Sequence, residues 1–259
     1  MKDVSGKASA RAASIPSDGS RVAVTARGEV FNVPVGEGVV RNITRTPGSN
    51  DRGAVWSPDG KYIAYIGDST GETEVYIQGA TGNPVQLTEG NDTYIRRVQW
   101  SPDSKKIFYT DRKNRLVEVD VATKAKRTVM QNPAGEFRSV SFSPCGNWIA
   151  YTKAAKNEMS VVYVYNLQTG KEIAVTEKWY DSSSPVFSTD GKYIIFTSAR
   201  DFNPTYGQLE WNHTYNNMNG VYMAMLAKST PSPLLPEDGK KAPAKPEAPA
   251  AKKGEAKPA

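Results

Sequence analysis

Residues 54–68 read AVWSPDGKYIAYIGD, and this stretch decides the fold because the chain repeats it. Four further segments carry the same succession of an apolar residue, a Ser-Pro-Asp-Gly-like turn and an alternating apolar run: 14–28, 98–112, 141–155 and 185–199. The turn position recurs every 41 to 45 residues. A period of this length is typical of one four-stranded blade of a β-propeller.

Each of these phrases has the chemistry of a β-hairpin. Asp59 and Gly60 tolerate the positive φ angles of a tight turn, and Pro58 favours an extended approach to it. After the turn, Ile63 and Tyr65 fall on alternate positions, as in a strand with one buried face. A third apolar segment follows in every copy and a short fourth one in four copies. We therefore predict an all-β fold, a β-propeller of four-stranded antiparallel blades.

A single blade cannot bury both faces of its sheet, so the blades must stack against one another. Large aromatic residues stand at equivalent positions of four copies: Trp56, Trp100, Phe142 and Phe187. We predict that they form the core between blades.

The number of repeats indicates an incomplete ring. Five copies are legible, and the fifth shows no clear outer strand after GVYMAML at 220–226. We predict an open arc cut from a six- or seven-bladed ring. In domain terms, residues 1–236 are predicted to form the propeller segment, and the Lys/Pro/Ala-rich residues 237–259 a disordered linker or tail.

The charge of the chain does not predict nucleic-acid binding. The net charge is +6, but the residues from Gly239 onward hold six lysines and two glutamates, so the remaining chain is close to neutral. A nucleic-acid surface requires basic residues clustered on the folded part. The chain also has no apolar run long enough to span a membrane. We expect neither nucleic acid nor membrane as a partner.

The residues predict no chemistry of their own. His213 is the only histidine and Cys145 the only cysteine, so a metal cluster with ordinary ligand spacing is not expected. The sequence has no Gly-x-Ser-x-Gly elbow, no phosphate-binding loop and no dinucleotide fingerprint. We predict no catalytic residue, no metal and no cofactor, which leaves the assignment as an enzyme uncertain.

The fifth copy contains an unusually long connection, RDFNPTYGQLEWNHTYNNMN at 200–219. Long loops on a propeller face are usually functional or form interfaces. Its aromatic and imidazole side chains are the candidate contacts for a partner or peptide: Phe202, Tyr206, Trp211, His213 and Tyr215. The alternative is a loop that folds on its own aromatic residues.

Two segments together resemble a known family. The Trp-Ser-Pro-Asp-Gly phrase alone is shared with TolB-type and other propellers of the WD40-like PD40 class. The combination of residues 14–66 with FNPTYGQLEWNHTYNNMNGVYMAMLAKSTPSP at 202–233 resembles the second, non-catalytic propeller region of tricorn-type proteases. The resemblance covers nearly everything outside the tail.

This resemblance implies a large multidomain serine peptidase that degrades peptides. Its propellers would act as channels or filters, with a PDZ-like module and the catalytic residues further along the polypeptide. Peptides and those downstream domains are then the implied partners, together with further copies of the protein. A cytoplasmic location is favoured, or a periplasmic one if the full-length protein carries a signal peptide.

Three functions follow as hypotheses. The favoured one is a propeller segment of a tricorn-like peptidase that serves as substrate channel, filter and domain scaffold. The alternative is a free-standing TolB-like propeller that binds a partner protein. An enzyme with its own site at the mouth of the ring rests on fold analogy alone.

Overall fold

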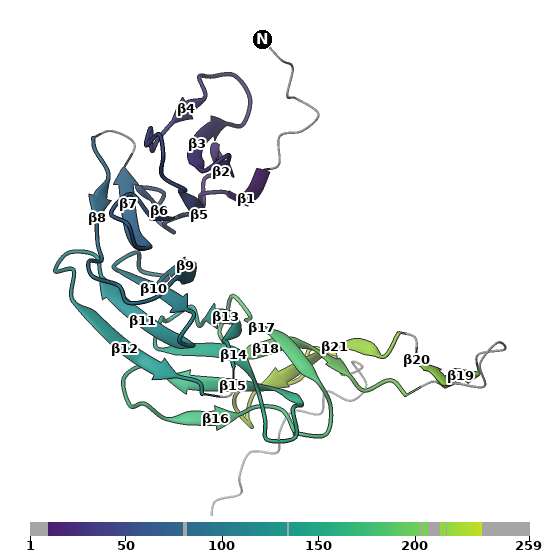
Figure 1. Ribbon diagram of the computed structural model, residues 1–259. Coiled ribbons are helices and arrows are strands. Elements are labelled where there is room, and N and C mark those ends of the chain that lie inside the picture. Colours follow the sequence, from purple (N-terminus) through teal and green to yellow (C-terminus); the bar gives the residue numbers. More distant parts are fainter. Residues whose placement is uncertain are drawn as a thin grey trace, which may run out of the picture.

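The computed structural model describes residues 10–79, 82–133, 135–202, 204–206, 213–215 and 217–234. Every regular element among them is a β-strand, as predicted. Five sheets follow one another along the chain and curve into an open arc, with the first and fifth sheets at its two ends (Figure 1). The predicted fold class and the open arc are confirmed, whereas the number of blades in a closed ring stays a prediction.

The strands are grouped blade by blade. Blade one contains β1 (Ala10–Ser14), β2 (Arg21–Ala26), β3 (Glu29–Pro34) and β4 (Arg41–Asn42). Blade two contains β5 (Arg52–Trp56), β6 (Tyr62–Gly67), β7 (Glu74–Gly79) and β8 (Val85–Gln86). Blade three contains β9 (Ile95–Trp100), β10 (Lys106–Asp111), β11 (Arg115–Asp120) and β12 (Lys126–Gln131). Blade four contains β13 (Arg138–Phe142), β14 (Trp148–Ala154), β15 (Ser160–Asn166) and β16 (Glu172–Ala174).

The fifth blade departs from this pattern. Its sheet contains β17 (Ser182–Phe187), β18 (Tyr193–Ala199) and β21 (Asn219–Met225). No fourth strand pairs with β21 among the described residues, in agreement with the sequence. The long connection instead contains a small hairpin of β19 (Pro204–Tyr206) and β20 (His213–Tyr215). Residues 235–259 lie outside the described part, so the boundary at 236 and the tail remain predictions.

Each repeated phrase forms the hairpin between the first two strands of a blade. In blade two, Trp56 lies opposite Ile63 in the antiparallel register. The turn closes with a hydrogen bond from the Gly60 N–H to the Ser57 carbonyl oxygen at 2.9 Å. Gly60 has a φ of +69°, a conformation that glycine adopts without the steric cost of a side chain.

The core lies between the blades, as the aromatic pattern predicted. Trp100 packs against side chains of blade two, and Trp56 packs against side chains of blade one. Phe187 belongs to the cluster between blades four and five. Phe142 is only partly buried, but its ring centroid lies 4.7 Å from that of Phe108 across the interface between blades three and four. Stacking of neighbouring blades therefore buries these apolar side chains.

Candidate functional site

Because the strands of each blade are antiparallel, their connections lie on two opposite faces of the arc. One face, here named the turn face, carries two connections of each blade: from the first strand to the second, and from the third strand to the fourth. The opposite face, the loop face, carries the connection from the second strand to the third and the connection that leads to the next blade. The long connection of blade five therefore belongs to the loop face.

The turn face is built from self-contained turns. The Ser57 hydroxyl donates to Asp59 Oδ1 at 2.6 Å, and that oxygen also accepts the Lys61 N–H at 3.1 Å. In blade four, Cys145 takes the aspartate position and lies 3.3 Å from the Ser143 hydroxyl. This hydrogen bond lowers the pKa of the exposed Cys145 thiol. The hydrogen bonds described here are thus formed between residues of the same repeated phrase.

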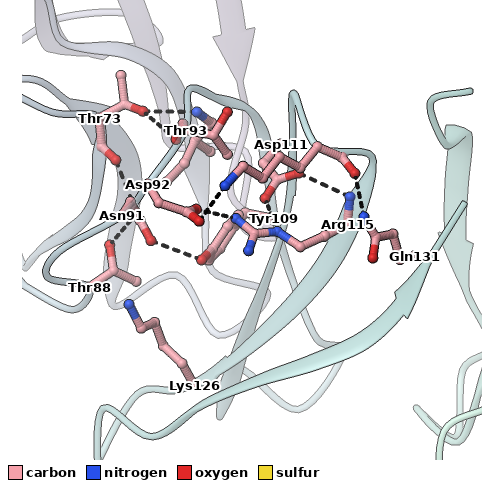
Figure 2. Close-up of polar contacts among 12 residues, drawn as sticks. Thr73, Thr88, Asn91, Asp92, Thr93, Tyr109, Asp111, Arg115, Lys126 and Gln131 are labelled. Carbon is pink, nitrogen blue, oxygen red and sulfur yellow. Dashed lines mark hydrogen bonds and ion pairs between the residues drawn. The ribbon is translucent and has the colours of Figure 1, made fainter. Parts of the chain in front are cut away.

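The loop face of blades two and three is an ordered polar network. Figure 2 shows Arg115 between two carboxylates: its Nε donates to the buried Asp111 at 2.6 Å, and its Nη2 donates to Asp92 at 2.6 Å. In the same network, the Tyr109 hydroxyl donates to Asn91 Oδ1 at 3.1 Å. These bonds join the connection after blade two to the hairpin of blade three. They fix the two loops relative to each other.

Asp92 gives this network a testable pH dependence. Hydrogen bonds from Lys113 and then from Arg115 lower the pKa of the Asp92 carboxyl to about 2. The stabilising contribution is therefore present above the unfolded-state pKa of about 3.9 and disappears as the pH falls towards the folded value. We expect Asp92→Asn to lower the urea midpoint of unfolding at neutral pH, with a difference that shrinks steadily below about pH 4. A difference that is independent of pH would contradict this assignment.

The loop face of blades four and five carries exposed aromatic side chains. Trp179 is 80% exposed and Tyr180 is 40% exposed, both in the connection from β16 to β17. Phe202, just after β18, is 70% exposed. Because β17 and β18 are antiparallel neighbours, their continuations bring Trp179 and Phe202 to the same end of the sheet. We name Trp179, Tyr180, Arg200 and Phe202 the aromatic platform.

The platform is held by its own contacts. The Ala199 N–H donates to the Asp181 carbonyl oxygen at 2.9 Å, which extends the pairing of β17 with β18 by one step. The Arg200 guanidinium lies over two rings, 5.3 Å from the centroid of Tyr180 and 5.0 Å from that of Tyr222. Cation–π contacts of this kind order a long side chain on a surface. The platform is therefore positioned by the sheet beneath it.

The structure describes four of the five predicted contact residues. Phe202 is exposed on the platform, as a contact residue should be. Tyr206 lies on β19 and faces His213 of β20 in the backbone register, with Tyr215 also on β20. Trp211 lies outside the described residues. A contact role for this set remains a prediction.

Sequence reasoning missed Trp179. The signal was present, because a tryptophan in the polar segment EKWYDSSS at 177–184 lies outside every alternating apolar run. An aromatic residue without a place in the repeat pattern has no core position to fill. Such residues in loops are candidates for contact surfaces.

In the described part of the chain, no group of three or more His, Cys, Asp or Glu side chains is arranged to hold a metal ion. Within the same residues, no helix is long and apolar enough to cross a membrane.

Comparison with protein families gives one match that spans nearly the whole chain. A family model described as the tricorn protease second beta propeller domain matches residues 10–257. Tricorn protease homolog 1 of Streptomyces coelicolor is 26% identical over 226 residues, which are 85% of this chain and 21% of that protein. The tricorn protease homolog of Saccharolobus solfataricus is 23% identical over 209 residues, 81% of this chain and 19% of that protein. The chain thus spans about a fifth of the length of these relatives.

Solved structures show the same fold. The crystal structure of the tricorn protease superposes with a TM-score of 0.78 at 20% identity, covering 89% of this chain and 23% of that one. A putative TolB from Agrobacterium tumefaciens superposes with a TM-score of 0.58 at 18% identity, covering 83% of this chain and 76% of that one.

Proposed function

This chain belongs to the family of tricorn protease second β-propeller domains, and we propose that it is a non-catalytic propeller segment of a tricorn-like peptidase. In this proposal the loop face contacts peptides on their way through the protein, so that the arc acts as a channel or filter. The blades also serve as a scaffold for the other domains. Bond cleavage takes place elsewhere in the polypeptide.

The observation that carries the proposal is the aromatic platform. Trp179 and Phe202 present large apolar surfaces to solvent on one face. Exposed aromatic residues bind unfolded peptides of varied sequence because their contacts depend on apolar area more than on a particular side chain. Arg200 adds a cation beside the rings, which favours acceptor groups of a passing backbone.

The free face of blade five supports a place within a longer polypeptide. Phe187 and Ile194 point towards blade four and are buried. Their neighbours Val186 and Ile195 lie opposite each other on the other side of the sheet and are exposed. An apolar sheet face of this kind is normally covered by another blade. We propose that further blades of the same polypeptide pack here.

The proposal predicts a length-dependent effect on peptide hydrolysis. In the native full-length polypeptide, we expect the double change Trp179→Ala and Phe202→Ala to raise KM for a long peptide about tenfold, the equivalent of about 1.4 kcal/mol of lost contact. We expect kcat to be unchanged, because the platform touches no reacting atom. A short fluorogenic peptide that does not reach the propeller should be cleaved as before. Steady-state kinetics with both substrates measure this.

A matched control is available on the turn face. Tyr62 is an exposed aromatic residue at the start of β6, and Tyr62→Ala should leave both substrates unaffected. Unchanged kinetics of the double variant with the long peptide would remove the platform from the proposal. An immunoblot of cell extract gives the size of the native protein. A band near the 28.3 kDa of this chain would favour the alternative, a free-standing TolB-like propeller that binds a partner protein.

A further inference from the structure

A small cavity lies between blades three and four, at the inner edge of the arc. Its volume is about 230 Å³. Figure 1 shows β5, β9 and β13, the first strands of their blades, along the concave side of the arc, whereas the fourth strands β8, β12 and β16 lie along its convex side. Each of these three inner strands contributes residues to the cavity. A chain that passes along the inside of the arc can therefore reach it.

The cavity has an apolar floor and a polar mouth. Phe108, Leu116 and Phe137 line it and are buried. Arg97 is exposed and Gln99 is half-buried, so the opening lies on the side of β9. Pockets for whole small-molecule ligands measure about 300–1,000 Å³. This smaller apolar space suits a single large side chain.

One buried hydroxyl of the lining lacks the partner that the repeat offers elsewhere. Thr110 is 9% exposed, and its hydroxyl makes no hydrogen bond with any described residue. At the equivalent position of blade one, Thr25 Oγ1 accepts the Ala54 N–H of the next blade at 3.3 Å. Val140 is equivalent to Ala54, but no hydrogen bond joins Val140 to Thr110, and both residues line the cavity. The unpaired hydroxyl is thus a feature of this cavity and not of the repeat.

The Thr110 hydroxyl is open to the cavity. Four unpaired side-chain atoms of the described residues are closed to solvent, and the Thr110 oxygen is not one of them. Unpaired polar groups on largely buried side chains are rare in native proteins and require an explanation. A molecule in the cavity can supply the missing partner.

Arg97 is a second departure from the repeat. The equivalent residues of the other four blades are small: Ala12, Gly53, Ser139 and Ser184. The neighbouring Arg96 is paired with Glu136, whereas Arg97 forms no hydrogen bond or ion pair within the described ranges. Arg97 is also the one charged residue of the lining. Since the other blades fold without a long cation at this position, the guanidinium is free to bind a ligand at the mouth.

We propose that this cavity binds one large apolar side chain of an extended peptide, while the polar groups at its mouth bind the backbone of the same residue. Arg97 can only donate, so it binds a backbone carbonyl oxygen. The Thr110 hydroxyl and the Gln99 amide can donate or accept, and both fit a peptide group. The inference rests on the proposed function, because its ligand is a peptide that passes the arc. It adds a preference for apolar residues and a contact separate from the aromatic platform.

The test uses the 259-residue chain with two uncharged peptides, acetyl-Gly-Gly-Leu-Gly-Gly-amide as probe and acetyl-Gly-Gly-Ser-Gly-Gly-amide as its polar counterpart. The methyl signals of Leu116 and Val140 are followed by NMR and assigned from Leu116→Ile and Val140→Ile. We expect the leucine peptide to move both signals and the serine peptide to leave them in place. The apolar floor accepts only the leucine side chain without leaving a polar group unpaired.

Two substitutions at the mouth measure the backbone contacts. We expect Arg97→Ala to bind the leucine peptide about tenfold more weakly, since one charge-assisted hydrogen bond is lost. Thr110→Val keeps the shape of the side chain and should weaken binding about fivefold, as for one neutral hydrogen bond. Arg112 is exposed on the loop face of the same blade and does not line the cavity, so Arg112→Ala is the matched control and should bind as the unchanged chain does.

Unmoved Leu116 and Val140 signals would overturn the proposal, and so would equal shifts with the serine peptide. Undiminished binding to both Arg97→Ala and Thr110→Val would do the same. The double change Trp179→Ala and Phe202→Ala separates the cavity from the aromatic platform. Shifts that persist in this variant support the cavity as a contact of its own, whereas shifts that vanish assign the peptide to the platform and overturn the proposal. Because the platform is tested by KM and the cavity by its own methyl signals, the two proposals can fail separately.

Discussion

Trp100→Ala is expected to lower the free energy of unfolding by about 3–5 kcal/mol, the range for a large aromatic residue removed from a packed core. Trp100 is 4% exposed and lies in the cluster between blades two and three. The change removes the indole from this interface and also leaves the Val55 carbonyl oxygen without its indole donor. Urea unfolding followed by circular dichroism gives the loss from the shift of the midpoint.

Trp179 is the matched control for this prediction. It is 80% exposed, so Trp179→Ala should change the free energy of unfolding by less than about 0.5 kcal/mol. Equal effects of the two changes would mean that the interface between blades does not carry the stability of the arc. A small effect of Trp100→Ala alone would mean that neighbouring side chains refill the space.

The fold could be predicted because its information is local and repeated. The turn at Asp59 and Gly60 and the alternation at Ile63 and Tyr65 define a hairpin within about a dozen residues. The repeat period indicates blades, and blades must stack to bury their faces. The sequence therefore predicts that Trp56 lies in an interface between blades. The missing outer strand of blade five could be predicted for the same reason, because comparison with the other four copies shows which segment the fifth copy lacks.

The site could be predicted only in part, because it depends on contacts between separate segments. Phe202 stood out in a long loop, but Trp179, at the same end of the sheet, comes from the connection between two blades. Trp56 and Trp100 are the same residue at the same repeat position, yet only Trp100 finds an acceptor. In blade one the residue equivalent to Val55 is Ser14, whose hydroxyl accepts the Trp56 backbone N–H at 3.0 Å. Sequence alone does not show which partner such a strand offers.

Glu74 is a second residue whose role no pattern indicated. Its buried carboxylate lies at the start of β7 and has no cation partner among the described residues. It accepts hydrogen bonds from the Asn91 N–H at 2.9 Å, from the Asn91 amide at 2.7 Å and from the Thr88 hydroxyl at 2.5 Å. Asn91 in turn accepts from Tyr109 of blade three. One carboxylate thus anchors the connection that leads from blade two to blade three.

Glu74→Ala is therefore expected to lower the free energy of unfolding by about 3 kcal/mol, because the Asn91 N–H and the Thr88 hydroxyl lose their buried acceptor. Glu74→Gln keeps one acceptor oxygen and should cost clearly less. Glu72, exposed in the connection from β6 to β7 just before Glu74, is the control: Glu72→Ala should shift the urea midpoint hardly at all. If Glu74→Ala is as stable as Glu72→Ala, relief from burying an unpaired charge offsets the lost hydrogen bonds. The carboxylate would then position the loop without stabilising the fold.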